Sequence, residues 1–395
     1  MAEVTILQVV PRLDAGGSEQ SAVEIAQALT HAGAKALVAT EGGRMATAVS
    51  DAGGEIISLP VASKNPVTIL ANARRLAKIV EARNVTLLHA RSRAPAWSTF
   101  LAARWTKRPF VTTYHGAYSS RAPFKTLYSS VMARGDRVIA NSHYTARLIA
   151  ARHHVPMEGM RVIYRGIDPS HFAQASIEPS RLDRLRTGWG VQEDQPVVLH
   201  AARLTSWKGQ NHVIEAARRM LAANQLGEAI FIFAGDAQGR DAYREELEQH
   251  IKAAGLEGRA RLVGHCDDIP AAFALAKVAV VASATAETFG RTSIESQAMG
   301  CPVIVTDVGA APENVIPAPS PNFTGWVVPP ADSAALATAI TNALALSPEE
   351  RAALGLRAHG HVAAQFALQK MQRSTLMVYD ELLGSNLAER FLLSV

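Results

Sequence analysis

The sequence has little of what builds disulfide frameworks, metal sites or membrane spans. Cys266 and Cys301 are the only cysteines among 395 residues, too few and too scattered for a disulfide framework or a cysteine metal site. The apolar runs fall far short of the roughly 20 residues of a membrane-spanning helix, and no basic segment or cleavage site of a signal peptide opens the chain. An Asp-x-Asp pair that would hold a divalent metal is also missing. We therefore expect a soluble, cytoplasmic protein with no metal.

What is present describes an ordinary globular chain of two domains, with 48% apolar and 19% charged residues. The charge is uneven. Residues 1–180 hold 21 Lys and Arg against 12 Asp and Glu, a net charge of +9, and residues 181–395 hold 19 against 23, a net charge of −4. A basic half indicates an acidic partner, which could be nucleic acid, an anionic lipid surface or a phosphorylated substrate. The basic residues form no runs and accompany no nucleic-acid motif, so we expect no nucleic acid partner.

Short β-branched runs alternate with alanine-rich helical stretches, which is the pattern of parallel β-α-β units. The strands predicted in the first half are residues 5–10, 36–40, 55–58, 87–90, 110–114, 137–140 and 161–164. A second series is predicted at residues 197–201, 230–233, 260–263, 278–282 and 302–305. The pattern is lost before the second series, and we interpret residues 176–195 as a linker. The sequence thus predicts an α/β protein with two doubly wound, Rossmann-like parallel sheets facing across a cleft, in domains 1–175 and 196–369.

Candidate binding residues of the first half follow predicted strands, where ligands of parallel sheets bind. Gly16 and Gly17 precede the first helix, where small residues let a ligand approach and the helix N-terminus favours an anion. The alternative is a tight turn with Ser18 as the helix cap. His115 and His89 lie at the predicted carboxyl ends of strands, where a histidine can donate to a ligand or carry a proton at neutral pH. Their alternative is a packed histidine.

The second half carries the strongest motif, Glu287-Thr-Phe-Gly-Arg-Thr-Ser-Ile-Glu295, which leaves a strand, turns at Gly290 and enters a helix. Free amides at residues 289–292 would offer an anion cradle. The alternative for Glu295 is a capping box begun by Thr292. Arg203 and Lys208 lie on an earlier loop, where two cations could neutralise a diphosphate. The alternative interpretation is that both are ordinary surface cations.

Further short elements occur in a fixed order along nearly the whole chain. They are Gly16-Gly17-x-Glu19, Tyr-His115-Gly, Asn141-Ser142, Val162-Ile-Tyr-Arg-Gly166-Ile-Asp168, Ala202-Arg203-Leu with Lys208-Gly209, Ala234-Gly235-Asp236, the Glu-x7-Glu signature with Gly-Cys-Pro-Val-Ile, and Gly325-Trp-Val-Val-Pro. This ordered set resembles the retaining, nucleotide-sugar-dependent glycosyltransferases of family 4, which have the GT-B fold. Two positions depart from the family. Arg165 replaces the usual Asn and has no assigned role. Arg291 replaces an aliphatic residue, and it could be a third phosphate ligand, an acceptor contact or a surface residue.

The resemblance implies roles for individual residues. Arg203 and Lys208 would bind the donor diphosphate, Glu287 would hold hydroxyls of the transferred sugar, and Glu295 would bind the ribose. The resemblance places the backbone of Phe289, Gly290, Arg291 and Thr292 and the loop of Gly16 and Gly17 against the phosphate and sugar of the donor. It places His115 near the anomeric centre. Gly264, His265 and Cys266 would lie against the base. The catalytic residues would be His115, Arg203, Lys208 and Glu287. The N-terminal domain would take the acceptor, the C-terminal domain the donor, and helix 370–395 would pack back on the N-terminal domain.

These implications define an expected activity. We expect a metal-independent, retaining hexosyltransferase that uses a UDP- or GDP-sugar as co-substrate and needs no cofactor. Its acceptor would be an anionic glycan or a lipid-linked acceptor of lipopolysaccharide or other bacterial envelope polysaccharide synthesis, and the basic half also suggests peripheral binding to the inner face of the cytoplasmic membrane. The alternatives are a GT-B epimerase or phosphorylase, and a non-catalytic protein that binds sugar nucleotides.

Overall fold

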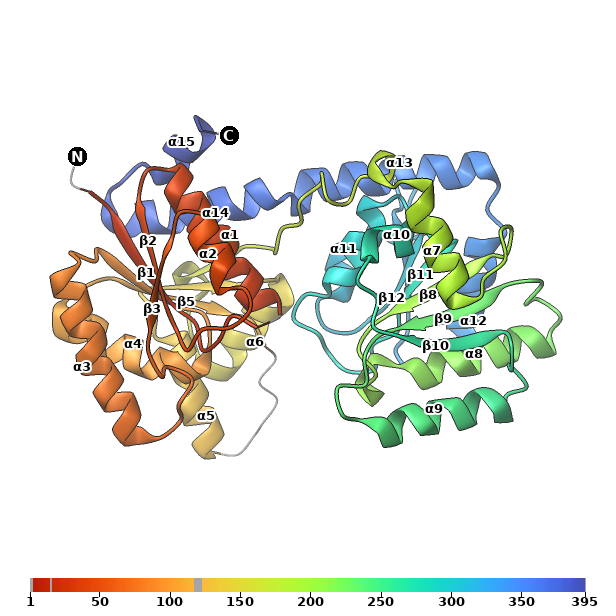
Figure 1. Cartoon of the computed structure of the whole chain (residues 1–395), viewed down its shortest axis with the longest axis horizontal. Coiled ribbons are helices and arrows are strands. Elements are labelled where there is room, and N and C mark those ends of the chain that lie inside the picture. Colours follow the sequence, from red (N-terminus) through yellow and green to blue (C-terminus); the bar gives the residue numbers. More distant parts are fainter. Residues whose placement is uncertain (1–2, 15, 117–122, 395) are drawn as a thin grey trace. The chain divides into compact units, whose positions relative to one another are not determined.

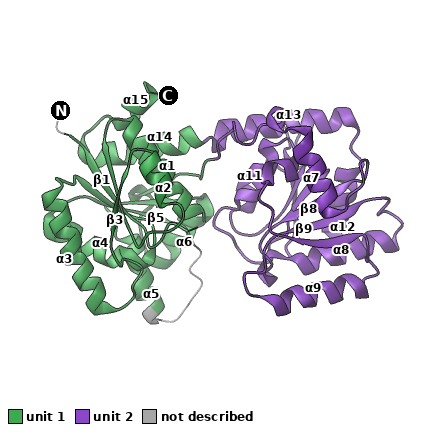
Figure 2. Cartoon of the chain, in the orientation of Figure 1, with its two compact units in different colours: residues 1–166, 368–395 green, residues 167–367 purple. Residues whose placement is uncertain are grey.

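The computed structural model describes residues 3–14, 16–116 and 123–394, and it divides into two compact units. Unit 1 comprises residues 1–166 and 368–395, and unit 2 comprises residues 167–367 (Figure 2). Each unit is built on one parallel β-sheet with helices packed on it (Figure 1). The two doubly wound α/β sheets predicted from the sequence are confirmed.

Unit 1 has a seven-stranded sheet in the order β3-β2-β1-β4-β5-β6-β7, and every neighbouring pair is parallel. Its strands are β1 (Thr5–Val9), β2 (Lys35–Thr40), β3 (Glu55–Ser58), β4 (Leu87–Ala90), β5 (Phe110–Tyr114), β6 (Arg137–Ala140) and β7 (Met160–Val162). The strand order reverses between β1 and β4. The loops that leave the carboxyl ends of these strands therefore flank the crevice in which such sheets bind ligands.

Helices cover both faces of the unit 1 sheet, and two buried apolar clusters fill the layers between. The helices are α1 (Gly17–His31), α2 (Ala46–Asp51), α3 (Pro66–Ala82), α4 (Arg93–Thr106), α5 (Pro123–Ser130), α6 (His143–His153), α14 (Leu368–Leu383) and α15 (Leu387–Leu392), with short 3-10 turns η1 (Val131–Ala133) and η2 (Met157–Gly159). The start of α3 shows how local sequence sets a boundary. The Asn65 side chain accepts hydrogen bonds from the amides of Val67 and Thr68, and Pro66 occupies the first helical position, where its missing N–H costs nothing.

The last two helices of the chain pack within unit 1. Helix α14 lies against α1, where the Gln372 side-chain amide donates to the carbonyl oxygen of Glu24 at 2.8 Å. The Tyr379 hydroxyl lies 2.7 Å from Nδ1 of His89 at the end of β4. Leu376 and Tyr379 are fully buried. The C-terminal segment is thus a structural part of the N-terminal fold.

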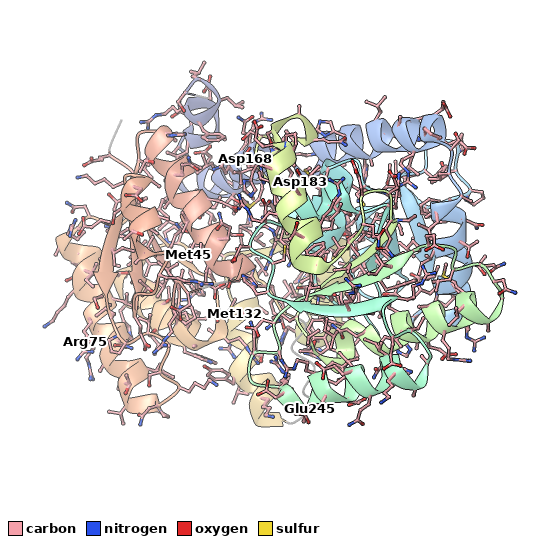
Figure 3. All side chains as sticks on the ribbon, turned by 45° about the vertical axis from the view of Figure 1, so that its right-hand side comes forward. Met45, Arg75, Met132, Asp168, Asp183 and Glu245 are labelled. Carbon is pink, nitrogen blue, oxygen red and sulfur yellow. The ribbon has the colours of Figure 1, made fainter. Side chains whose placement is uncertain are left out.

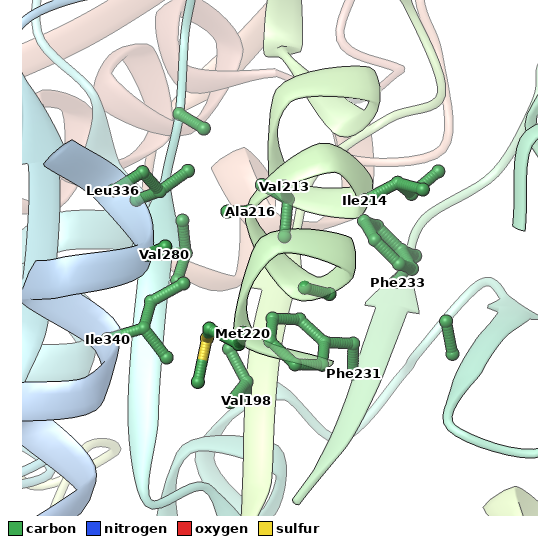
Figure 4. Packing of buried hydrophobic residues seen from close by; sticks show 14 of the residues in the cluster. Val198, Val213, Ile214, Ala216, Met220, Phe231, Phe233, Val280, Leu336 and Ile340 are labelled. Carbon is green, nitrogen blue, oxygen red and sulfur yellow. The ribbon is translucent and has the colours of Figure 1, made fainter. Parts of the chain in front are cut away.

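Unit 2 has a six-stranded parallel sheet in the order β10-β9-β8-β11-β12-β13. Its strands are β8 (Val197–Ala201), β9 (Ile230–Ala234), β10 (Ala260–Gly264), β11 (Val278–Val281), β12 (Val303–Thr306) and β13 (Gly325–Val328). Its helices are α7 (Pro179–Trp189), α8 (Gln210–Ala222), α9 (Asp241–Ala253), α10 (Ile269–Leu275), α11 (Arg291–Ala298), α12 (Ser333–Leu344) and α13 (Pro348–Phe366), with 3-10 turns η3 (Gln174–Ser176), η4 (Ser206–Lys208) and η5 (Ala311–Asn314). Figure 4 shows how Val213, Ala216 and Met220 of α8 pack onto strand residues such as Val198 and Phe231.

The stretch expected as a linker, residues 176–195, holds helix α7 instead and belongs to unit 2. The Arg181 guanidinium binds the Asp268 carboxylate through two hydrogen bonds of 2.6 and 2.8 Å, and Trp189 is buried. Prolines mark the ends of this stretch, but the helix between them docks on α10 through these contacts. Across the part of the chain that the structure describes, no helix has both the length and the apolarity to cross a membrane.

Candidate functional site

In unit 2, Arg203 and Lys208 lie on the loop between β8 and α8. This loop passes the end of β11 so closely that a Cβ on Gly209 would stand 1.9 Å from the carbonyl oxygen of Ala282. Gly209 also has a φ of +78°, a conformation that side chains other than glycine seldom adopt. The side-chain amide of Gln210 donates to the carbonyl oxygen of Arg203 at 2.9 Å. The backbone that carries both cations is therefore fixed from two sides.

Lys208 and Glu287 meet at this edge of the sheet. The Lys208 ammonium lies 2.7 Å from Oε1 of Glu287, and the two side chains are only 14% and 13% exposed. The Ser283 hydroxyl donates to the same carboxylate oxygen, and the Lys208 ammonium stands 4.5 Å from the centre of the Trp207 ring. The backbone of Glu287 is held too, since its carbonyl accepts from the Ala310 amide at 2.9 Å. An ion pair in so enclosed a place is ordered and only weakly screened by water.

Arg203 is placed differently from Lys208. It is exposed, and its guanidinium donates to the Gln238 side chain at 3.3 Å. The structure therefore joins Lys208 with Glu287 and leaves Arg203 at the rim of the same loop, accessible to a ligand.

Helix α11 begins at Arg291 with Gly290 as its N-cap, and the cap makes no side-chain hydrogen bond. The interpretation of Thr292 to Glu295 as a capping box is therefore wrong. The Thr292 hydroxyl points to the carbonyl of Ala201 at 3.5 Å, and Glu295, one turn inside the helix, accepts from Nε of Arg291 at 3.1 Å. The helix starts two residues earlier than a capping box on Thr292 needs, because Gly290, with φ +84°, makes the turn into it.

The turn before α11 is held by a residue that the motif analysis missed. The side-chain amide of Asn314 donates to the carbonyl oxygens of Phe289 and Gly290, at 2.6 and 3.2 Å, and to the Ser293 hydroxyl at 2.9 Å. The Phe289 ring is buried and packs edge-on against Phe366. Only backbone atoms of Phe289 can therefore meet a ligand. Sequence carries no signal for Asn314, since it follows Ala-Pro-Glu on a separate turn.

The three residues expected at the nucleotide base lie at the carboxyl end of β10: Gly264 is its last residue, and His265 and Cys266 follow it. Gly264 and His265 are exposed, and Nε2 of His265 lies 3.0 Å from an Asp267 carboxylate oxygen in open solvent. Cys266 is buried, and burial raises the pKa of its thiol. The amide of Gly235, after the neighbouring β9, donates to the carbonyl of Gly264 at 2.7 Å, which ties the two strand ends together. The exposed pair leaves polar groups for a ligand, and the cysteine contributes packing.

In unit 1, helix α1 begins at Gly17 with Gly16 as its N-cap, without a side-chain cap. The interpretation of Ser18 as the helix cap is therefore wrong, because the Ser18 hydroxyl donates to the Glu19 carboxylate at 2.6 Å. Gly16 is exposed with a φ of +147°, and a Cβ there would stand 2.5 Å from a Glu19 carboxylate oxygen. The first amides of α1 are thus set in the glycine loop, where an uncapped helix start favours an anion.

His115, Arg165 and Gly17 meet at one point of unit 1. The Arg165 guanidinium lies 3.0 Å from Nδ1 of His115, and a Cβ on Gly17 would stand 1.7 Å from another nitrogen of the same guanidinium. Burial lowers the pKa of His115 well below its ordinary value, and the positive charges of Arg165 and Arg91 lower it further. His115 is therefore neutral at physiological pH.

Two further residues of unit 1 lie beneath this point. His89 is fully buried, with Nδ1 at the Tyr379 hydroxyl and Nε2 at the Thr113 hydroxyl, each at 2.7 Å. These contacts make it a packed histidine, as its alternative interpretation states. Arg91 is 3% exposed and donates to the Gln8 side chain at 2.6 Å. Sequence analysis missed Arg91, although it follows the strand β4 directly.

The chemistry of the two units differs in kind. Unit 2 gathers cations, carboxylates and a helix start, which suits an anionic ligand that also carries hydroxyls. Unit 1 gathers a neutral histidine, arginines and a second helix start. Within the described ranges 3–14, 16–116 and 123–394, no group of three or more His, Cys, Asp or Glu residues is placed to hold a metal ion.

Comparisons with known proteins match both units. Residues 183–360 match the family "Glycosyl transferases group 1", and residues 15–171 match "Glycosyltransferase Family 4". A crystal structure of a glycosyltransferase from Rickettsia africae ESF-5 is 32% identical, with a TM-score of 0.88 over 98% of this chain and 100% of that one. HepE of Anabaena in complex with UDP and glucose is 25% identical, with a TM-score of 0.80 over 96% of this chain and 100% of that one. The alpha-D-kanosaminyltransferase of Streptomyces kanamyceticus is 27% identical over 80% of this chain and 81% of its own length.

Proposed function

The chain belongs to the family 4 glycosyltransferases of GT-B fold, and on this premise we propose that it transfers a hexose-type sugar, with retention of anomeric configuration, from a UDP- or GDP-sugar to an anionic glycan or lipid-linked acceptor. The donor binds unit 2 and the acceptor binds unit 1. The similarity to HepE, whose structure contains UDP and glucose, supports a nucleotide sugar as the donor and makes UDP-sugars the first to test.

The observation that carries this proposal is the enclosed pair of Lys208 and Glu287. A donor sugar needs two things at one point: a cation for the diphosphate and an acceptor of hydrogen bonds for the sugar hydroxyls. The ammonium and the carboxylate stand side by side at the carboxyl edge of the sheet, with Arg203 exposed on the same loop. A ligand that carries both groups can engage both side chains without a large rearrangement.

The reaction then proceeds by electrostatic stabilisation of the leaving group. The bond between the anomeric carbon and the diphosphate oxygen breaks, and its electron pair goes to that oxygen. The acceptor oxygen forms its bond on the same face, and its proton passes to the departing phosphate. Lys208, Arg203 and the first amides of α11 stabilise the charge that develops on the diphosphate. The chain thereby supplies with its own cations what a metal ion would supply, and we propose a metal-independent enzyme.

The acceptor proposal follows from the charge of unit 1. Its residues include 24 Lys and Arg against 13 Asp and Glu, a net charge of +11, whereas unit 2 has 16 against 22, a net charge of −6. A domain with this excess attracts an anionic partner. A phosphorylated glycan or a lipid-linked acceptor of envelope polysaccharide synthesis has that charge.

The same excess supports peripheral binding to the inner leaflet of the cytoplasmic membrane. Helices α3 and α4 pack together and expose basic residues beside apolar ones (Figure 3 labels Arg75 on α3). The exposed residues concerned are Val67, Leu70, Arg74, Arg75, Lys78, Arg104, Trp105, Lys107 and Arg108. Lys125 on α5 is exposed as well, and Arg121, a further basic residue that we assign to this surface from the sequence, lies outside the described residues. Each basic side chain close to an anionic surface contributes about 1 kcal/mol.

The decisive experiment is a donor screen over UDP- and GDP-sugars that monitors nucleotide release, followed by NMR of the anomeric configuration of the product. We expect release with one nucleotide class and an unchanged anomeric configuration. Titration calorimetry that finds sugar-nucleotide binding without any product would favour the non-catalytic alternative, and an epimerised sugar would favour the epimerase.

Membrane binding is tested separately by sedimentation with anionic and neutral vesicles at low and high salt. We expect binding to anionic vesicles only, with loss at high salt. Equal and negligible binding to both vesicle types contradicts the membrane proposal and leaves the transferase proposal untouched.

A further inference from the structure

Arg165 stands where the family usually has asparagine, and its surroundings give it a role. Its guanidinium occupies the space beside Gly17, 1.7 Å from the position of a Cβ on that residue, and reaches Nδ1 of His115 at 3.0 Å. Gly17 is not among the glycines of positive φ, and the three atoms nearest to its Cβ position all belong to Arg165, so its lack of a side chain makes room for the arginine. The N-terminal glycine loop, the end of β5 and the segment after β7 therefore converge on one guanidinium.

The chemistry of the two groups fixes the direction of their hydrogen bond. A guanidinium carries only donors, and it stays protonated at any physiological pH. Nδ1 of His115 must therefore be the acceptor, with its lone pair toward Arg165. A neutral imidazole has one proton, so that proton lies on Nε2. The opposite edge of the ring then presents an N–H donor.

The charges around the ring act in the same direction. Arg165 faces it from the segment after β7, Arg91 from the segment after β4, and His89 from β4 itself. Both arginines disfavour a second proton on the imidazole. A protonated ring would also lose the lone pair that accepts from Arg165. The ring is thus kept from acting as a cation, and as long as Nδ1 is engaged it cannot act as a base through that nitrogen.

We infer that Arg165 is a positioning residue that holds His115 as the neutral Nε2–H tautomer, so that the ring donates a hydrogen bond to a substrate oxygen. The tautomer follows from the geometry of unit 1 alone, whereas its use in catalysis rests on the proposed sugar transfer. The oxygens offered by a sugar nucleotide and its acceptor are hydroxyl and phosphoryl groups, and an N–H donor serves either. An asparagine is shorter and carries no charge, so the arginine supplies both the reach to Nδ1 of His115 and the resistance of the ring to protonation.

The test reads the ring directly, by NMR of the full chain with ¹⁵N-labelled histidine. A His115→Gln variant assigns its signals among the thirteen histidines. In the wild type we expect a proton on Nε2, an unprotonated Nδ1, and no titration of the ring as the pH falls to 6. In Arg165→Met, which keeps length but removes charge and donors, we expect mixed tautomers and an apparent pKa that moves up toward the ordinary histidine value.

Two further variants separate this role from general damage. Gly17→Ala leaves the arginine in the sequence but fills its place, so it should alter the His115 signals in the same direction as Arg165→Met. Arg83→Met removes an exposed guanidinium that binds Glu55 at the end of α3, and it should leave the His115 signals unchanged. If Arg165→Met fails to fold, the wild-type tautomer and Gly17→Ala still decide the question.

The kinetic prediction is a pH-dependent loss. Arg165→Met should lower turnover about fourfold at pH 6 and less at pH 8, because at the ordinary histidine pKa of about 6.5 only about a quarter of the ring stays neutral at pH 6. Three results overturn the inference: a wild-type proton on Nδ1, the same tautomer and titration in Arg165→Met, or an altered ring with unaltered turnover. If no sugar transfer is found for the wild type, the NMR experiment still reports the tautomer, so the two failures are distinguishable.

Discussion

The two units place similar loops at similar strand ends, yet they treat positive charge in different ways. At the candidate site of unit 2, Lys208 and Arg291 each face a carboxylate, that of Glu287 and that of Glu295. In unit 1 Arg165 donates to a neutral imidazole, and Arg91 donates to an amide oxygen. The net charges of −6 and +11 follow the same division. A ligand of unit 2 must compete with the carboxylates that already bind Lys208 and Arg291, whereas the net positive charge of unit 1 favours an anionic partner.

This difference has a consequence for selectivity. Glu287 binds Lys208 before any ligand arrives. A bare anion therefore gains little binding energy at this pair, because it must compete with the carboxylate for Lys208 and is repelled by the negative charge of the carboxylate. A ligand that brings hydroxyls for the carboxylate as well as phosphates for the ammonium satisfies both. The pair therefore favours a sugar diphosphate over phosphate alone, in agreement with the proposed donor.

The largest expected effect comes from removing the cation of this pair. Lys208→Ala should lower turnover by at least about 10²-fold, the scale for losing a charge contact in a transition state. Lys277→Ala is the matched control, since that exposed lysine precedes β11 at the opposite edge of the sheet. Steady-state kinetics with the donor found in the screen measure both. Turnover like the wild type in Lys208→Ala, and also in Arg203→Ala, would contradict the assignment of the diphosphate site to unit 2.

The two carboxylates of unit 2 should separate in a smaller effect. Glu287→Gln should lower transfer about tenfold, because a hydrogen bond to a charged group is worth roughly 1.5–3 kcal/mol. It should leave binding of free nucleotide intact, since Lys208 then lacks its competing carboxylate. Glu295→Gln should weaken binding of the nucleotide itself. Titration calorimetry with UDP and GDP measures the affinities, and equal affinity in wild type and Glu295→Gln would leave Glu295 only its contact with Arg291.

A stability change should distinguish the interiors of the units. Tyr379→Phe removes the hydroxyl next to buried His89 and should lower the stability of unit 1 by about 1–3 kcal/mol, the cost of a buried polar group left without its partner. Tyr243→Phe is the control in unit 2, because its hydroxyl makes a longer bond of 3.3 Å to the Gln210 side chain at a half-buried position. Hydrogen exchange of α14 amides measures the effect in unit 1. Equal exchange in the wild type and Tyr379→Phe would mean that this hydroxyl does not hold the C-terminal helix.

The sequence predicted most of the sheet because buried parallel strands are short, β-branched and regularly spaced. It missed β13 (Gly325–Val328), whose four residues follow a turn rich in Pro, Ser and Asn that looks like loop. The start of α1 was also misplaced, because serine has a higher propensity for the N-cap position than glycine. In the structure Gly16, and not Ser18, is the N-cap. Lys208 and Glu287 could be brought together from strand order, because β8 and β11 are neighbours. The contact of Arg165 with His115 could not, since β6 separates β5 from β7 and only a long side chain spans that distance.

Removal of divalent metal should have no effect on turnover. If Lys208, Arg203 and the start of α11 carry the charge of the leaving diphosphate, excess EDTA should leave turnover unchanged at saturating donor. The measurement needs an enzyme freed of metal beforehand and a coupled assay that itself needs none, with Mg²⁺ and Mn²⁺ added back as separate arms. Divalent cations that gather loosely at the surface of acidic unit 2 would alter the salt dependence without altering turnover. Activity abolished by EDTA and restored by either metal would contradict the proposal that protein cations alone stabilise the leaving group.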